Sequence, residues 1–427
     1  MDEIKITGWR SHDVRFPTSD GKHGSDAMNK DPDYSAAYIV LETNRAGLAG
    51  HGLTFTIGRG NELCVKAAEM LADKLVGRGL GQITKDMAGF WREITGDSQL
   101  RWLGPDKGVV HLATGAVVNA VWDLWAKAER KPVWRLVGDM TPDDILACID
   151  LRYLTNAITR DEARAILERA AEGKEARIAT LRREGYPAYT TSAGWLGYDD
   201  ATIRKAAHAA YDTGFRHFKL KVGQNLSDDK RRAGILREVI GADAKLMFDA
   251  NQVWEVSEAI AAMKELRAFD PWFIEEPTSP DDILGHAEIR AAIAPIKVAT
   301  GEMCQNRIMF KQFMQANALD IVQIDAARVG GLNENLATML LAAKFNKLIC
   351  PHAGGVGLCE YSQHLSMIDY LVVSGEMEGR VCEFVDHLHE HFITPCVVSN
   401  GRYIAPEAAG FSIEMKQISI DAFTFRG

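Results

Sequence analysis

The chain lacks the features that mark membrane-bound, secreted and nucleic-acid-binding proteins. It has no long basic run, and its 49 Lys and Arg against 58 Asp and Glu give a net charge of −9. An acidic chain of this kind disfavours nucleic acid and anionic membranes as main partners. No apolar stretch approaches the roughly 20 residues that span a bilayer, and the opening MDEIKITGWRSHDVRF lacks the apolar core of a signal peptide. We therefore expect neither nucleic acid nor membrane as a partner.

Cysteine is sparse and shows no pairing pattern. The chain has seven cysteines, an odd number, and none has C-x-x-C spacing: Cys64, Cys148, Cys304, Cys350, Cys359, Cys382 and Cys396. Scattered thiols of this kind are typical of a reducing compartment rather than of a disulfide framework. We expect a cytoplasmic protein.

Length and pattern predict two domains. The 427 residues exceed the roughly 250–300 at which one hydrophobic core stops growing. Residues 1–145 predict an α+β domain, with strands in EIKITGW and AAYIVLET and helices after them, the clearest in GVVHLATGAVVNAVWDLWAKAER before Pro132. We expect the segment 396–427 to pack back on this domain and complete it.

From about residue 185 the pattern becomes regular. Eight β-rich runs follow one another, and seven helical segments separate them: YPAYTTS, HFKLKVG, AKLMFDAN, PWFIEEP, IKVATGE, DIVQIDAARVG, KLICPHAGG and RVCEFVDH. This alternation predicts a parallel (β/α)7β barrel, a modified TIM barrel, over residues 146–395. The charged, alanine-rich stretch near 157–183 predicts a helical insertion.

Each of these runs after the first ends in, or contains, an acidic, basic or imidazole side chain. The residues are Lys219, Lys221, Asp249, Glu275, Glu276, Glu302, Asp325, His352 and Glu383. A single polar residue after a strand only starts a loop or caps a helix. The catalytic groups of such barrels lie at the carboxyl-terminal rim, so seven successive strand ends of this kind favour one active site.

Three of the acids predict a metal site. Asp249, Glu275 and Glu302 follow successive strands, and three carboxylates in a semi-enclosed site need a counter-charge. An all-oxygen ligand set favours Mg²⁺ over Zn²⁺, and Mn²⁺ can substitute. Three solvated acids are the alternative, and they would require a wide-open mouth.

The basic residues predict groups that transfer protons. Lys219 and Lys221 lie two apart on a strand, so both point into the mouth. Their repulsion and a nearby metal should lower their pKa values and allow one of them to act as a base. Asp325 ends the strand before that of His352, where it would fix the imidazole tautomer and stabilise its protonated form.

Together these motifs resemble the enolase superfamily, in its mandelate-racemase-like branch, over nearly the whole chain. The stretch AVWDLWAKAERKPVWRLVG resembles the end of that superfamily's capping domain. The loop VRFPTSDGKHGSDAMNKDPDYSAAY resembles that of the L-fuconate dehydratases within the branch. The implied fold is α/β, a (β/α)7β barrel with an α+β N-terminal capping domain.

The resemblance implies a hydro-lyase of sugar catabolism that converts L-fuconate to 2-keto-3-deoxy-L-fuconate. Lys221 would remove the C2 proton, Lys219 would offset charge on the carboxylate, and Mg²⁺ on the three acids would stabilise the enediolate, as is established for this superfamily. His352, held by Asp325, would protonate the departing 3-hydroxyl, and a protonated Glu383 would hydrogen-bond the carboxylate. The implied substrate contacts are Gly24, Ser25, Asp26, Tyr34, Lys219, Lys221, Glu302, His352 and Glu383.

Other readings stay open. Racemisation or cycloisomerisation would use the same scaffold, although a cycloisomerase would favour a lysine where Asp325 stands. A non-catalytic carbohydrate-binding descendant predicts the loss of a ligand or base, and none is lost. His387, His389 and His391 in DHLHEH suggest zinc, but no partner ligands stand out in the sequence. We expect a small sugar acid as the ligand and a homo-oligomer as the assembly.

Overall fold

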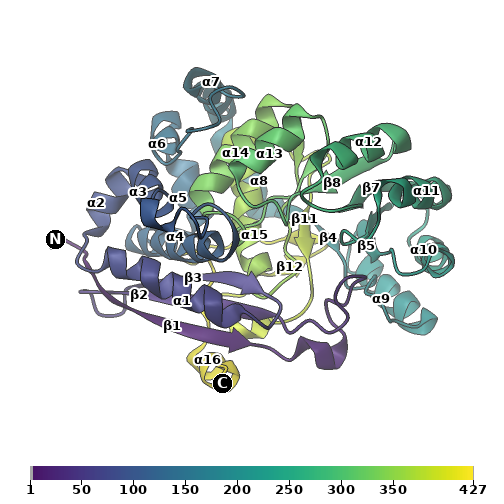
Figure 1. Cartoon of the computed structure of the whole chain (residues 1–427), viewed down its shortest axis with the longest axis horizontal. Helices are drawn as coiled ribbons and strands as arrows, with labels where there is room; N and C mark the ends of the chain where they lie inside the picture. The colour runs from purple at the N-terminus through teal and green to yellow at the C-terminus, as the bar shows by residue number, and fades with distance from the viewer. Residues whose placement is uncertain (1–2, 427) are drawn as a thin grey trace.

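The computed structural model describes residues 3–426 and has two parts, an N-terminal α+β layer and a barrel (Figure 1). The N-terminal sheet is antiparallel, in the order β1 (Ile6–Arg15), β2 (Ser35–Thr43), β3 (Ala49–Thr56). The first two strands confirm the predicted runs, but β3 was not predicted, because its glycines weaken the strand pattern. A Cβ on Gly52 would overlap the Ala116 carbonyl oxygen, so glycine here permits close packing against a helix.

That helix is α4 (Gly108–Ala128), which packs on β2 and β3. By length and composition α4 is apolar enough to cross a membrane, contrary to the expectation that no stretch is. However, 83% of its apolar window is buried inside the fold, so packing between the sheet and the barrel accounts for its composition. The neighbouring helices are α1 (Asn61–Ala72), α2 (Leu80–Lys85), α3 (Met87–Thr95), α5 (Val133–Asp139) and α6 (Pro142–Ala147).

The predicted barrel is confirmed. Its eight parallel strands are β4 (Tyr186–Thr190), β5 (His217–Lys221), β6 (Lys245–Asp249), β7 (Pro271–Glu275), β8 (Lys297–Thr300), β9 (Ile321–Val322), β10 (Leu348–Ile349) and β11 (Cys382–Phe384). β11 pairs with β4. The amide of Glu383 donates to the carbonyl of Pro351 at 3.2 Å and joins β11 to the segment after β10, which closes the ring.

Seven helices surround these strands, each in the interval between two of them. They are α9 (Asp200–Asp212), α10 (Leu226–Ile240), α11 (Val256–Leu266), α12 (Ile283–Ile293), α13 (Arg307–Gln315), α14 (Leu332–Lys344) and α15 (Leu358–Ile368). This order places the carboxyl ends of all eight strands at one rim, the rim that faces the N-terminal domain.

The stretch near 157–183 contains two helices, α7 (Arg160–Ala171) and α8 (Lys174–Glu184). α7 begins at a capping box of Thr159 and Glu162. Gly173, with a φ of +69°, separates it from α8. Both helices contact the π-helical turn Asp369–Ser374 on the outside of the barrel.

The C-terminal tail contacts both parts of the molecule. Its hairpin, β12 (Val398–Ser399) and β13 (Arg402–Tyr403), pairs antiparallel with β4. Its last helix, α16 (Gln417–Phe423), lies beside β1 (Figure 1), and the rings of Phe423 and Phe16 are 4.7 Å apart. The tail thereby ties the N-terminal domain to the barrel wall.

Candidate active site

The strand register brings the predicted catalytic residues together. Lys221 pairs with Asp249 across β5 and β6, and Asp249 pairs with Glu275 on β7. The Nζ of Lys221 lies 2.6 Å from Asp249 Oδ2. The Nζ of Lys219 lies 2.8 Å from an oxygen of Glu275, 2.8 Å from one of Glu383 and 3.2 Å from Asp249. Two ammonium groups of β5 therefore connect the carboxylates of three other strands, β6, β7 and β11.

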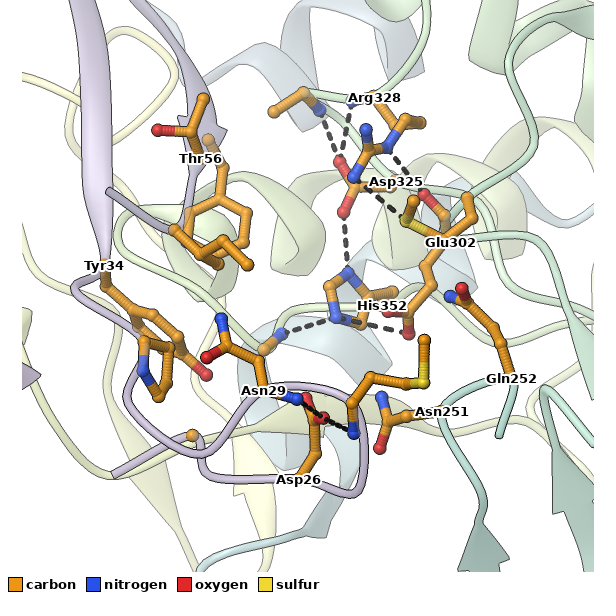
Figure 2. A pocket seen from close by; sticks show the side chains of 18 of the residues that line it. Asp26, Asn29, Tyr34, Thr56, Asn251, Gln252, Glu302, Asp325, Arg328 and His352 are labelled. Carbon is orange, nitrogen blue, oxygen red and sulfur yellow. Dashed lines mark hydrogen bonds and ion pairs between the residues drawn. The ribbon is translucent and has the colours of Figure 1, made fainter. Parts of the chain in front are cut away.

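Asp325 and His352 form the predicted dyad (Figure 2). His352 Nδ1 lies 2.7 Å from Asp325 Oδ2, and its Nε2 lies 3.4 Å from Glu302 Oε2. The other oxygen of Asp325 accepts from the amides of Ala327 and Arg328, at 2.6 and 2.9 Å, which fixes the carboxylate. Burial lowers the pKa of His352, but Glu302, Asp325 and Glu383 outweigh it and raise the pKa to about 10. A protonated imidazole fits the role of an acid.

The protein's own residues raise the pKa values of the two lysines, whereas the prediction of lowered values included a nearby metal. Burial lowers the pKa of Lys221, but the carboxylates, Asp249 foremost, raise it above its ordinary value in spite of Lys219. The pKa of Lys219 is raised well above its ordinary value by Glu275 and Glu383. Each ammonium contacts carboxylate oxygens directly, and this attraction exceeds the repulsion between the two lysines. A divalent cation on the same carboxylates would oppose it.

The mouth holds more negative than positive charge. Five carboxylates, those of Asp249, Glu275, Glu302, Asp325 and Glu383, share the three cations of Lys219, Lys221 and His352. Within residues 3–426, Glu275 Oε2 and Glu276 Oε1 are buried without a hydrogen-bond partner. Burial and Asp249 raise the pKa of Glu275 well above its usual range. Orphaned oxygens and surplus negative charge are what a hard divalent cation would satisfy.

Asp249, Glu275 and Glu302 have the right chemistry to hold Mg²⁺, since all their donors are oxygen. The expectation that they gather within a few ångströms is met only in part. In the described part of the chain their oxygens do not all lie within 4.8 Å of one another. Lys219 and Lys221 contact Glu275 and Asp249, and His352 lies 3.4 Å from Glu302. An ion would compete with the two ammonium groups for these oxygens.

Glu383 is ionised, which corrects the expectation that it is protonated. Burial raises its pKa, but Lys219, His352 and the amide of Ala353 outweigh burial and lower it to about 2. Both of its oxygens accept hydrogen bonds, one from Thr191 Oγ1 at 2.7 Å and the other from Ala353 N at 2.9 Å. Glu383 therefore balances the charge of Lys219 and His352 and cannot donate to a substrate carboxylate.

A cavity of about 380 Å³ opens above these groups, between the barrel rim and the loop between β1 and β2. Gly24, Asp26 and Tyr34 of that loop line it, as predicted, together with Lys221, Glu302, His352 and Glu383 of the barrel. Gly24 has a φ of +79°, and a Cβ there would overlap the Tyr34 ring, so only glycine fits.

Two of the predicted contacts do not reach this cavity. Ser25 is buried, and its Oγ donates to the Lys30 carbonyl at 3.1 Å, because the turn directs the side chain into the loop. Lys219 is 1% exposed and lies below the cavity floor, where three carboxylates surround it. Its effect on a ligand would pass through those carboxylates.

The sequence did not single out several other residues that line the cavity. The polar ones are Asn29, Thr56, Arg59, Asn251, Gln252 and Arg328, and the apolar ones include Met28, Phe55, Ile57, Leu112, Trp195 and Met303. Gln252 donates to Glu276 at 2.8 Å, and Arg328 Nε donates to the Glu302 carbonyl at 2.9 Å. Asn251, Gln252 and Arg328 surround the pocket (Figure 2). Their places two or three residues after the strand-end acids Asp249 and Asp325 were the available signal.

A capped barrel with clustered carboxylates, a lysine and an imidazole at one rim defines a class of enzymes that move protons next to a carboxylate. The chain belongs to the enolase superfamily. Residues 202–419 match the enolase C-terminal domain-like family, and residues 28–138 match the mandelate racemase / muconate lactonizing enzyme N-terminal domain.

Relatives in the same superfamily extend over nearly the whole chain. The L-galactonate dehydratase of Hypocrea jecorina is 57% identical over 100% of this chain and 95% of its own length. The human mitochondrial enolase superfamily member 1 has a crystal structure that matches with a TM-score of 0.98 and 52% identity, over 99% of this chain and 97% of that one. The L-talarate/galactarate dehydratase of Salmonella typhimurium, liganded with Mg and L-lyxarohydroxamate, matches with a TM-score of 0.79 and 25% identity, over 99% and 94%.

Proposed function

We propose that this chain is a Mg²⁺-dependent hydro-lyase that dehydrates an acid sugar, with L-fuconate as its first substrate. The observation that carries the proposal is the pairing of two proton-transfer groups in one cavity: Lys221 beside the carboxylate set, and His352 held by Asp325. Dehydration needs both a base at C2 and an acid at the 3-hydroxyl. The relatives named as dehydratases support this reading.

The residues divide the reaction between them. Bound Mg²⁺, or Mn²⁺ in its place, would be held by Asp249, Glu275 and Glu302 and would supply positive charge at the substrate carboxylate. Once these acids are neutralised, Lys221 Nζ can lose its proton and take the one from C2. The electron pair at C2 then expels the 3-hydroxyl, and His352 Nε2 donates a proton to it, so that water leaves. The enol product becomes a 2-keto-3-deoxy acid.

The choice of sugar rests on the wall of the cavity. L-Fuconate is 6-deoxy-L-galactonate, so it differs from L-galactonate only by a methyl group in place of the terminal CH₂OH. Met28, Ile57 and Leu112 give the cavity an apolar side, which suits the methyl group. Because an apolar wall rejects an added hydroxyl by only about 10²-fold, L-galactonate, the substrate in the name of the 57% identical relative, should also react.

One residue favours a second class of substrate, a six-carbon diacid. Arg59 lines the cavity and is exposed, and no ion pair of its guanidinium is found within residues 3–426. A guanidinium is a strong partner for a second carboxylate. The relative named L-talarate/galactarate dehydratase is 30% identical over 75% of this chain. If Arg59 selects diacids, Arg59→Ala should reduce kcat/KM for galactarate and leave that for L-fuconate almost unchanged.

The test is to supply L-fuconate, L-galactonate and galactarate in turn, with Mg²⁺ and with EDTA, and to measure the 2-keto-3-deoxy product. Mg²⁺-dependent turnover of L-fuconate at a higher kcat/KM than L-galactonate is the expected result. A galactarate rate above both would transfer the proposal to diacids. Exchange of the C2 proton in D₂O with no dehydration of any of the three would replace it by racemisation.

A further inference from the structure

A second cluster of chemically reactive side chains lies behind the active site. Cys359 at the start of α15, His389 in the 3-10 turn His389–His391, and Cys396 in the tail each offer a ligand atom, and these atoms lie within 4.8 Å of one another. His389 Nδ1 is 3.4 Å from Cys396 Sγ and 2.8 Å from Glu360 Oε1. Cys359, Glu360 and Cys396 are buried. None of these residues lines the catalytic cavity.

The hydrogen bond on the far side of His389 orients its ring toward this cluster. Nε2 lies 2.7 Å from the Val385 carbonyl, to which it can only donate. Nδ1, on the other side of the ring, faces Glu360 Oε1 and Cys396 Sγ, and a metal that displaced its proton would use its lone pair. A histidine that binds a metal through one nitrogen commonly donates the other N–H to a backbone carbonyl.

The structure also separates the three histidines of DHLHEH, which the sequence suggested together as zinc ligands. His387 lies beside His23 and Tyr34, with ring centroids 5.3 and 5.6 Å away. His391 packs on Phe16 at 4.5 Å. His389 alone of the three reaches the cysteines, 30 residues from Cys359 and 7 from Cys396 in the numbering. The partner ligands that did not stand out in the sequence are these two cysteines.

We propose that Cys359, His389 and Cys396 bind one Zn²⁺ ion, and that the neighbouring carboxylate of Glu360 moves in as the fourth ligand. Two thiolates, an imidazole and a carboxylate make a tetrahedral donor set that suits zinc and is too soft for Mg²⁺. With Zn–S near 2.3 Å and Zn–N near 2.0 Å, a tetrahedral ion places sulfur and nitrogen roughly 3.5 Å apart, against the 3.4 Å between Cys396 Sγ and His389 Nδ1. The side chain of His389 is 20% exposed and gives an ion its way in.

This ion would join three segments that the catalytic rim depends on. Cys359 Sγ faces the carbonyls of Ala353 and Val385, at 3.6 and 3.9 Å. The amide of Ala353 donates to Glu383, and His352 directly precedes Ala353. The zinc would therefore fix the start of α15, the segment after β11 and the tail in one position. Val385, in the segment after β11, is two residues from Glu383 of the active site. Its role is structural, because no donor of the set reaches the catalytic cavity.

The test reads the thiolates directly and does not depend on turnover. The full-length protein, purified in reducing buffer, is analysed for zinc per chain, stripped with a chelator and titrated with Co²⁺. We expect one zinc per chain and, with Co²⁺, the intense near-ultraviolet charge-transfer absorption of cobalt–thiolate bonds. Cobalt in the Mg²⁺ site cannot give this band, because its donors there are oxygens. Success or failure here is thus separate from that of the proposed dehydration.

Variants assign the band to residues. Cys396→Ser and His389→Gln should each weaken or abolish it, whereas Cys64→Ser, a buried free cysteine on α1, should leave it unchanged. Absence of a thiolate band in the folded wild-type protein would overturn the proposal. So would an intact mass short by two hydrogens, with Cys359 and Cys396 joined in one peptide, because a disulfide cannot supply two thiolates.

Discussion

The molecule contains two buried clusters of charged side chains, and they differ in how their carboxylates are satisfied. The first is the rim cluster, made of the carboxylates, lysines and His352 described above. The second, the interface cluster, centres on Glu334 of α14, where the barrel meets the N-terminal domain. Glu334 Oε2 lies 2.6 Å from His111 Nε2 of α4 and accepts from Gly330 N at 2.6 Å. Its Oε1 accepts from the backbone amide of Arg307 at 2.8 Å and lies 3.4 Å from the guanidinium of that residue.

The two clusters differ in which groups satisfy their buried carboxylates. Burial raises the pKa of Glu334, but His111 and Arg307 more than compensate and lower it to about 2, so protein groups alone satisfy the carboxylate. At the rim, Glu275 has a raised pKa and an oxygen without a partner within residues 3–426. A satisfied network stabilises a fold, and an unsatisfied one marks a place where a ligand binds. Substitutions should therefore cost activity in the rim cluster and stability in the interface cluster.

The largest effect should come from Lys221→Ala at the rim. Loss of the base should lower kcat for L-fuconate by about 10⁴-fold, while the thermal midpoint stays near that of the wild type, because Asp249 keeps Lys219 as a partner. Steady-state kinetics and thermal unfolding measure the two. Lys230→Ala is the matched control, since Lys230 is partly exposed on α10, far from the rim acids in the chain, and pairs with Glu265. A kcat within tenfold of the wild type would remove Lys221 from the chemistry.

The next largest effect should come from Glu334→Ala in the interface cluster. Removing one partner leaves His111 and Arg307 buried without their counter-charge, which costs about 3–5 kcal/mol of the free energy of unfolding. Urea unfolding measures it. Glu407→Ala provides the control, because Glu407 pairs with Arg182 at the surface, where such a pair is worth about 0–1 kcal/mol. Equal losses in the two variants would mean that burial does not distinguish them.

The sequence predicted the rim cluster better than the interface cluster for a physical reason. Parallel strands place their carboxyl ends at one edge, so Lys221, Asp249 and Glu275 could be brought together from their positions alone. His111 and Glu334 are 223 residues apart and lie on helices, where no such rule applies. The partners of His389 are only 30 and 7 residues away, but they lie on a helix and in the tail, where no such rule applies either.

The protonation states of the site residues also could not be predicted from the sequence. The pKa of Lys221 rises if carboxylates are its nearest charged neighbours and falls if the other ammonium is. Only distances decide which holds. Glu383 was expected to be protonated, yet the contact with Lys219 keeps it ionised. Ser25 was expected at the ligand from the resemblance, and the loop sequence could not show that its side chain turns toward the Lys30 carbonyl instead.

Lowering the pH should remove the contribution of Glu334 to the stability of the interface cluster. Its pKa in the folded protein, about 2, lies below its ordinary value of 4.5, so its contribution is present above about pH 4.5 and is lost as the pH falls toward 2. The full difference is worth about 3 kcal/mol. The gap in stability between the wild type and Glu334→Gln, from urea midpoints at pH 6, 5, 4 and 3, should therefore narrow as the pH falls. A gap that stays constant over this range would show that Glu334 has the same pKa in the folded and the unfolded protein.

The smallest effect, and the one that separates the clusters most directly, is stabilisation by Mg²⁺. At a free Mg²⁺ concentration of 100 times Kd, binding to the folded state alone adds about 2.7 kcal/mol to the free energy of unfolding. Glu275→Gln should reduce this increment, because it replaces an anionic ligand by an amide, while without Mg²⁺ the variant should be at least as stable as the wild type. Glu334→Gln should be less stable than the wild type yet keep the whole increment, since the carboxylate of Glu334 has protein partners and no role for Mg²⁺.

Thermal unfolding with and without Mg²⁺ measures both variants, and Glu265→Gln, on the surface of α11, is the control. If Glu275→Gln gained as much from Mg²⁺ as the wild type, the ion would bind elsewhere, and the orphaned oxygen of Glu275 would need another explanation.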